Sequence, residues 1–333
     1  MDAGFWAKLK KRGGPIVAMA PMANVTDAAF RRMFVRFGAP DVFWTEFVSV
    51  EGLLSRGREQ LLVDLWFSEA EHPIVAQVFG SKPEQFGEVA AMLRGLGFDG
   101  IDINMGCPDS GVERSGAGAA LIKDSALAKE IVRATKRGAG GLPVSVKTRL
   151  GYRATGEMAA WLTALLEEDL AALTVHLRTR NEMSDVPAHW ELARNIVALR
   201  DRVAPGTLVL GNGDVATLED ARVRAAESGL DGVMVGRGMF GNPWFFSGRV
   251  PELREKLTAM AEHAELFEEL YRGKPEGGRQ LKNFDIMKKH FKAYCAGFDG
   301  AKELRVRLME TENAAGVRRL TGEFLNNLPD GVV

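Results

Sequence analysis

Apolar residues up to about residue 235 gather in short runs that alternate with longer amphipathic stretches. The runs are rich in Val, Ile and Ala and end at Gly, Pro or polar residues, which is typical of buried strands in a parallel sheet. We therefore expect strands at residues 16–20, 42–47, 74–79, 100–104, 143–148, 172–176, 208–211 and 232–235.

Between these runs, apolar residues recur every three or four positions, as they do on one face of a helix. Pro83, Asp124 and Thr217 are residue types that favour the start of a helix, and each lies where such a segment begins. We expect helices at residues 27–37, 83–96, 125–136, 157–169, 190–203 and 217–228.

The regular alternation predicts the fold class. Eight strand–helix units within about 235 residues fit an α/β protein of the (β/α)8 TIM barrel type, which typically has about 250 residues. A doubly wound open sheet is the rival, but it rarely needs eight evenly spaced parallel strands, and no GxGxxG follows the first strand.

The pattern changes after residue 248, where only helical periodicity rich in Glu, Lys and Leu remains. We predict a barrel domain of residues 1–248 and a small helical domain of residues 249–333, which a Gly/Pro break at 273–278 divides. Basic residues among aromatic ones indicate either a solvated face or an RNA contact. The basic residues are Lys282, Lys288, Lys289, His290, Lys292, Lys302, Arg305 and Arg307, and the aromatic ones, expected mostly in the core, are Phe284, Phe291, Tyr294 and Phe298.

Composition narrows the class of protein. The 333 residues carry a formal net charge of -1, so RNA would be bound by local basic patches rather than by overall charge. Cys107 and Cys295 show no spacing typical of a disulfide framework or a metal site. No signal sequence or membrane-spanning run is evident, and we expect a cytoplasmic protein without metal.

Every predicted strand is followed by a polar or backbone-exposing feature. In a TIM barrel these strand ends meet at one mouth, where active sites lie. Each residue alone has an ordinary explanation as a hydrogen-bonded core group, but eight together favour a site. In chain order the features are Pro21-Met22-Ala23-Asn24, Thr45 with Glu46, Gln77, Asn104 with Cys107, Lys147 with Arg149, His176 with Arg178, Asn212-Gly213-Asp214, and Gly236-Arg237-Gly238.

The last two strand ends predict a phosphate site. Barrels often bind phosphate after strands seven and eight, where glycines leave backbone N–H groups uncovered, and Arg237 adds a charge. A phosphate next to Lys147 and Gln77 suggests a flavin, because a cation suits the N1/C2 edge that gains negative charge on reduction. Gln77 would bond the pyrimidine edge, and His176 offers a further donor or contact.

The loop at 104–108 is the second candidate for chemistry. Cys107 follows the fourth strand and precedes Pro108, which cannot continue a ladder. A buried Cys often serves as a small apolar residue, but the flanking Asn, Gly and Pro favour a functional thiol.

These residues resemble the tRNA-dihydrouridine synthases, flavoenzymes that reduce uridines in tRNA. The resemblance covers nearly the whole chain and depends most on the Asn-x-Gly-Cys-Pro element at 104–108 combined with Lys289-His290-Phe291 and 297–301 of the tail. It implies FMN as cofactor, NADPH as reductant, tRNA as partner, and a tail that binds RNA through residues such as Lys289 and Arg305. We also expect a monomer. The implied FMN-binding residues are Pro21, Met22, Ala23, Gln77, Lys147, His176, Asn212, Gly213, Asp214, Gly236 and Arg237.

The resemblance also implies a chemistry. Cys107 matches the proton donor to C5 of the uracil ring, while a hydride from reduced flavin goes to C6, and Asn104 matches a residue that bonds the uracil edge. A thiol with a pKa near 8.5 remains mostly protonated at neutral pH. The base must leave the RNA stack, and Arg149, Arg178 and Arg180 are candidates for the backbone contacts that offset this cost.

Two positions depart from the family pattern. Leu177 follows His176 where Gly or Ala is common, so its side chain either crowds the flavin phosphate or enters the core. The loop at 109–116 is less basic than is usual, which leaves the tRNA position open. The alternatives are an FMN oxidoreductase acting on a small molecule such as dihydroorotate, a flavin-dependent RNA methyltransferase, and a non-catalytic RNA-binding protein.

Overall fold

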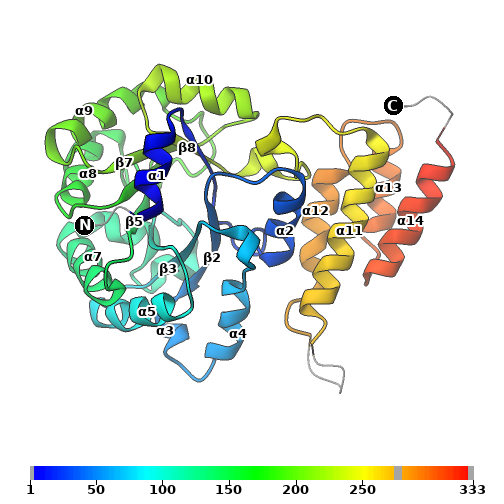
Figure 1. The fold of residues 1–333 in the computed structure, drawn as a ribbon, viewed down its shortest axis with the longest axis horizontal. Helices are drawn as coiled ribbons and strands as arrows, with labels where there is room; N and C mark the ends of the chain where they lie inside the picture. The colour runs from blue at the N-terminus through cyan, green and yellow to red at the C-terminus, as the bar shows by residue number, and fades with distance from the viewer. Residues whose placement is uncertain (1–3, 274–279, 329–333) are drawn as a thin grey trace.

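A closed barrel of parallel strands forms the larger part of the molecule (Figure 1). The computed structural model describes residues 4–273 and 280–328. The sheet order is β1-β8-β7-β6-β5-β4-β3-β2, and a bridge between Ala18 and Val42 joins β1 to β2 and closes the ring. The strands are β1 Ile16–Met19, β2 Phe43–Ser49, β3 Ile74–Phe79, β4 Gly100–Met105, β5 Val144–Arg149, β6 Ala172–His176, β7 Leu208–Asn212 and β8 Gly232–Val235.

Helices cover the outside of the barrel. All eight strands and the six predicted helices are confirmed, with bounds that shift by a few residues. Four further helices of the barrel region, α1, α3, α4 and α6, were not predicted because they are short or lie in loops. The helices are α1 Gly4–Arg12, α2 Ala28–Phe37, α3 Val50–Leu53, α4 Arg58–Leu62, α5 Pro83–Gly95, α6 Ser110–Arg114, α7 Ser125–Ala139, α8 Met158–Leu166, α9 Ala193–Val203 and α10 Leu218–Ser228.

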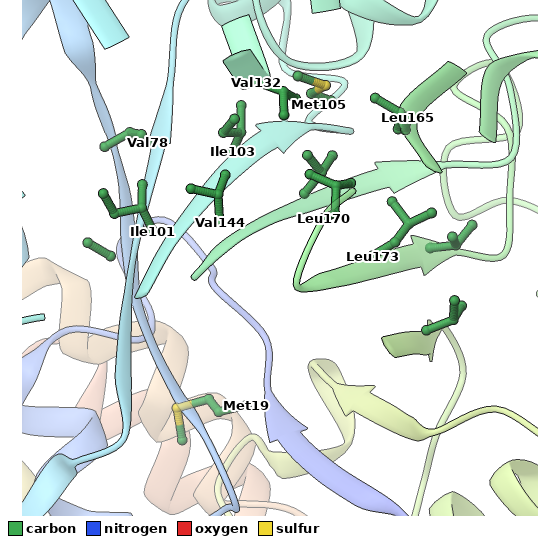
Figure 2. Packing of buried hydrophobic residues seen from close by; sticks show 14 of the residues in the cluster. Met19, Val78, Ile101, Ile103, Met105, Val132, Val144, Leu165, Leu170 and Leu173 are labelled. Atoms are coloured by element: carbon green, nitrogen blue, oxygen red, sulfur yellow. The ribbon is translucent and has the colours of Figure 1, made fainter. Parts of the chain in front are cut away.

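The main core lies between the strands and these helices. Successive side chains of a strand point to opposite faces, so Ile101, Ile103 and Met105 of β4 are fully buried toward the helices (Figure 2). The residues between them, Asp102 and Asn104, therefore belong to the inner face. This alternation explains how buried strands bring polar groups to the inside of the barrel.

The end of the barrel where the strands begin is filled with apolar side chains. Trp6 of α1 is 2% exposed and packs with the first residues of several strands, and its ring lies 5.9 Å from that of Trp44. A plug at this end leaves the carboxyl ends of the strands as the open mouth.

A group of helices with its own core follows the barrel and lies next to α2 (Figure 1). Phe284, Phe291 and Tyr294 are buried in it, as expected for most of the aromatic residues of the tail. The domain boundary at residue 248 stays a prediction, and residues 274–278 of the predicted Gly/Pro break lie outside the described residues. The helices are α11 Leu253–Tyr271, α12 Met287–Tyr294, α13 Ala301–Leu308 and α14 Ala314–Asn326.

Two residues of the predicted basic face are not on the surface, and this part of the prediction is wrong. The Lys282 ammonium is buried against the carboxylates of Glu46 and Asp64. His290 is 1% exposed, and its ring lies 4.7 Å from that of His263. Burial lowers the pKa of His290 well below its usual value, so this ring adds no positive charge to an RNA-binding surface.

Candidate active site

The strand register brings the predicted residues together at the mouth. Asn104 of β4 lies beside Lys147 of β5, and Arg149 at the end of β5 lies beside His176 of β6. His176 in turn pairs with Asn212 of β7. Residues from four neighbouring strands therefore form one continuous arc.

A cavity of about 250 Å³ opens over this arc. Nine of the eleven residues predicted to bind the cofactor line it, whereas Ala23 and Gln77 are not among its described lining residues. Sequence reasoning did not assign Ser184, Val215 or Met234 to the site, because no local motif marks them. The lining residues are Ala20, Pro21, Met22, Lys147, His176, Ser184, Asn212, Gly213, Asp214, Val215, Met234, Gly236, Arg237 and Gly238.

Glycines shape the wall that follows β7 and β8. Gly213 has a φ of +129°, and a Cβ there would approach Ala188 Cβ to 2.8 Å. A Cβ on Gly238 would lie 2.1 Å from the carbonyl oxygen of Val215. Both positions therefore require glycine, and the backbone itself forms this side of the cavity.

Lys147 supplies an unpaired cation at the base of the cavity. Within the described part of the chain its ammonium has no hydrogen-bond acceptor and no ion-pair partner. Burial, with the nearby Arg149, lowers its pKa to about 8. A half-buried cation with no acceptor from the described residues is free to bind a ligand, so the site suits an anionic or carbonyl-bearing group.

His176 faces the same cavity in its neutral form. Its Nε2 lies 3.1 Å from an Arg178 nitrogen, and a guanidinium can only donate, so Nε2 accepts and Nδ1 carries the proton. Burial, with the surrounding cations, lowers the pKa of His176 well below its usual value. The imidazole therefore offers one N–H donor and no positive charge.

A chain of hydrogen bonds connects polar side chains of β3, β4 and β5. Asn104 Nδ2 donates to Gln77 Oε1 at 3.0 Å, and Gln77 Nε2 donates to Asp102 Oδ2 at 2.6 Å. Ser145 Oγ donates to the other oxygen of Asp102 at 2.5 Å. Burial raises the pKa of Asp102 to about 6. Gln77 is fully buried, and its amide oxygen and one amide hydrogen are bonded to Asn104 and Asp102. It therefore supports Asn104, and its contact with the cofactor stays a prediction.

Asn104 fixes the loop that carries Cys107. Its Oδ1 accepts the backbone N–H groups of Gly106 at 3.1 Å and Cys107 at 2.9 Å. The Cys107 carbonyl accepts the N–H of Ala119 at 2.9 Å. A Cβ on Gly118 would lie 2.7 Å from that carbonyl, so this close approach requires glycine.

The surroundings of Cys107 favour the protonated form of its thiol. The residue is half-buried, and burial raises the pKa of the thiol above its ordinary value. It belongs to none of the apolar clusters of the described residues. The arrangement favours a thiol that keeps its proton until a base or carbanion approaches.

The three arginines expected at the rim differ in position. Arg149 is 5% exposed and donates to the carbonyls of Gly106, Thr179 and Met183. Arg178 is 2% exposed and is paired with Asp214. We expected both guanidinium groups around the rim, but neither is free at the surface. The physical reason is that several backbone carbonyls and one carboxylate at the mouth need donors.

Arg180 reaches the surface. Its guanidinium pairs with Glu113 of α6, and its side chain is 27% exposed. Lys289 is exposed on α12 and Arg305 is half-buried on α13. Leu177 is fully buried in the main core, so it does not crowd the cavity.

A metal-binding cluster and a membrane-spanning helix are both absent from residues 4–273 and 280–328. No group of three or more His, Cys, Asp or Glu residues is placed to hold a metal ion. No helix among them has the length and apolar character that crossing a membrane requires.

Comparisons with known protein sequences agree with the motifs. The family model described as dihydrouridine synthase matches residues 18–328. The chain is 43% identical to a probable tRNA-dihydrouridine synthase of Staphylococcus aureus (strain Mu50), over 100% of this chain and 99% of that protein. It is also 43% identical to probable tRNA-dihydrouridine synthase 2 of Bacillus subtilis (strain 168), over the full length of both. Among solved structures, an old yellow enzyme homologue from Zymomonas mobilis has a TM-score of 0.47 and 17% identity, covering 68% of this chain and 86% of that chain. The chain therefore belongs to the dihydrouridine synthase family, whose members are oxidoreductases.

Proposed function

We propose that this protein reduces uridines in tRNA to 5,6-dihydrouridine, with FMN as its cofactor and NADPH as the source of electrons. The observation that carries the proposal is the pairing of two features at one mouth. One is a cavity with an unpaired Lys147 ammonium and an imidazole N–H of His176. The other is a protonated thiol on the adjoining loop.

The cavity residues fit FMN. The glycine-bounded wall after β7 and β8, together with Arg237, suits the phosphate, because backbone N–H groups and a guanidinium are preferred phosphate partners. Lys147 suits the edge of the isoalloxazine that gains negative charge on reduction. Reduced FMN held by these residues would supply the hydride for C6 of the uracil ring.

Cys107 supplies the proton. Reduction of the C5–C6 double bond adds a hydride at C6 and a proton at C5, and the thiolate left on Cys107 regains a proton from solvent. A positioned acid contributes about 10²–10⁴-fold to such a step. Asn104 binds two backbone N–H groups of the loop and so holds the sulfur in place. No acceptor for the second hydrogen of its amide is present among the described residues, and we assign that hydrogen to the uracil edge.

Basic residues that reach the surface would make the contacts with RNA. We assign Arg180 at the mouth and Lys289 and Arg305 on the helical domain to the tRNA backbone, and Arg149 and Arg178 to holding the loops of the mouth. These contacts offset the cost of extruding the base, which is a few kcal/mol. We expect a monomer that acts in the cytoplasm, where tRNA is found.

The test is direct. The purified protein is expected to be yellow, and with NADPH it should form dihydrouridine in tRNA lacking that modification, as measured by mass spectrometry of nucleosides. Cys107→Ala should keep its FMN and lose at least about 10²-fold in turnover. A colourless protein that cannot be reconstituted with FMN would refute the proposal. Turnover of a small molecule such as dihydroorotate, without turnover of tRNA, would favour the alternative oxidoreductase.

A further inference from the structure

A second cavity, of about 590 Å³, lies beside the mouth between the segments that follow β4 and β5. Its volume falls within the range of about 300–1,000 Å³ that is usual for ligand pockets. We refer to it as the shoulder pocket. It is lined by Ile122, Lys123, Ser125, Tyr152, Arg153, Glu157, Ala160 and Trp161.

Cations are gathered around one aromatic ring in the shoulder pocket. The Lys123 ammonium lies 4.6 Å from the ring centre of Tyr152, and the Arg180 guanidinium lies 5.6 Å from it. Lys123 and Arg153 are both exposed, and neither has a carboxylate partner among the described residues. Holding an exposed Lys over a ring restricts its many rotamers, which lowers the entropy cost of binding an anion.

The one carboxylate in the pocket is already engaged. Glu157 accepts the backbone N–H groups of Tyr152 at 2.7 Å, of Arg153 at 3.1 Å and of Ala154 at 3.3 Å. These bonds hold the carboxylate against its own loop and reduce its competition for the cations. With two cations and one carboxylate, the lining carries a net positive charge.

Backbone hydrogen bonds attach the shoulder pocket to the catalytic loop. Lys123 ends the 3-10 segment Gly118–Lys123, whose Ala119 N–H donates to the Cys107 carbonyl at 2.9 Å. On the other side, the N–H of Asn181 donates to the carbonyl of Tyr152 at 3.0 Å. The pocket is therefore held in a fixed relation to the thiol by segments that follow three successive strands.

We propose that the shoulder pocket binds a nucleotide that flanks the extruded uridine, with its phosphate held by Lys123 and Arg153 beside Tyr152. This inference rests on the proposed function, because it takes RNA as the substrate. An exposed basic pocket whose segment is hydrogen-bonded to the loop of the reacting thiol suits a polyanion that continues on either side of the target base. Tyr152 acts as a platform that aligns Lys123 with the phosphate.

The experiment measures equilibrium binding of unmodified tRNA to the FMN-loaded protein by fluorescence anisotropy over a range of salt concentrations. Lys123→Ala should bind about tenfold more weakly at low salt, the effect of one lost charge-assisted contact. It should also reduce the magnitude of the slope of log K against log[salt] by about 0.7, the value for one phosphate contact on a single strand. Tyr152→Ala should weaken binding as well, whereas Tyr152→Phe keeps the ring and should bind like the unchanged protein. Lys8→Ala, an exposed Lys of α1, is the matched control and should change neither quantity.

The outcomes separate this inference from the proposed function. Binding by the unchanged protein with no change in Lys123→Ala or Tyr152→Ala would overturn the shoulder pocket alone. A raised KM for NADPH in these variants, with tRNA binding intact, would also overturn it, because the pocket would then hold the dinucleotide. Absence of tRNA binding by the unchanged protein would instead overturn the proposed function. The rate of NADPH oxidation without tRNA reports the integrity of the flavin site in every variant.

Discussion

Removal of Lys282 should weaken the junction between the barrel and the helical domain. The side chains of Lys282 and Glu46 are 6% and 4% exposed, and Lys282 also lies 2.7 Å from Asp64. Glu46 accepts the backbone N–H of Asn24 with its other oxygen, so it connects the β1–α2 loop to the pair. Lys282→Met leaves a buried carboxylate without its cation, which typically costs about 3–5 kcal/mol.

The cost should depend on pH in a defined direction. Burial raises the pKa of Glu46 to about 7 although Lys282 lowers it. Because the pKa of Glu46 is raised in the folded protein, its protonated form stabilises the fold. This contribution is fully present below about pH 4.3, the usual pKa of Glu. It is lost as the pH rises through about 7. Without the cation the pKa rises further, so Lys282→Met should cost about 3–5 kcal/mol at pH 8 and only about 1–2 kcal/mol at pH 5.

Urea unfolding followed by Trp fluorescence measures both values, since the chain has six Trp residues. The double variant Lys282→Met with Glu46→Gln should recover about 2 kcal/mol or more at pH 8, because the most deeply buried carboxylate of the pair is removed together with its cation. Lys288→Met is the matched control, and its pair with Asp285 at the surface should matter by less than about 1 kcal/mol. An equal cost at both pH values, or strict additivity in the double variant, would refute the reasoning.

Three further predictions concern the site. Burial raises the pKa of Cys107, so the single-turnover rate should stay level through about pH 8.5, the usual pKa of a thiol, and fall only above it. A fall that begins near pH 7 would contradict the assignment of Cys107 as the proton donor. Gly238→Ala places a Cβ 2.1 Å from the Val215 carbonyl, so it should cost about 1–3 kcal/mol in urea unfolding and lower the FMN content seen by absorbance. Lys147→Met should release FMN about tenfold more readily, as measured by the fluorescence of free flavin, and unchanged retention would argue against a contact.

The fold was predictable because its signal is local and repeated. Strands such as β3 and β6 were predicted with their observed bounds, since a short apolar run between turn residues needs no knowledge of distant contacts. Short helices such as α3 and α6 escaped prediction because a few residues carry no periodicity. The arc of strand-end residues was predictable for the same reason, because a barrel brings equivalent ends together.

Side-chain partners were not predictable, because they depend on residues far away in the sequence. In the sequence Lys282 cannot be distinguished from a surface lysine. Its buried partner, Glu46, lies 236 positions earlier in the chain. The sequence predicts Arg149 and Arg178 as cations around the rim of the mouth. In the structure Arg149 donates to backbone carbonyls of neighbouring loops, and Arg178 pairs with Asp214. The cofactor contact of Gln77 stays a prediction, but its hydrogen bonds to Asp102 and Asn104, 25 and 27 positions away, were not predictable.

The way the barrel closes has a consequence for the helical domain. β1 and β8 share four register pairs, whereas in the described residues a single bridge, Ala18 with Val42, joins β1 to β2. The chain between these two strands forms α2, against which α11 packs. The helical domain therefore also supports the wall of the barrel between β1 and β2. Amides along β1 should exchange with deuterium faster once the packing of α11 against α2 is weakened.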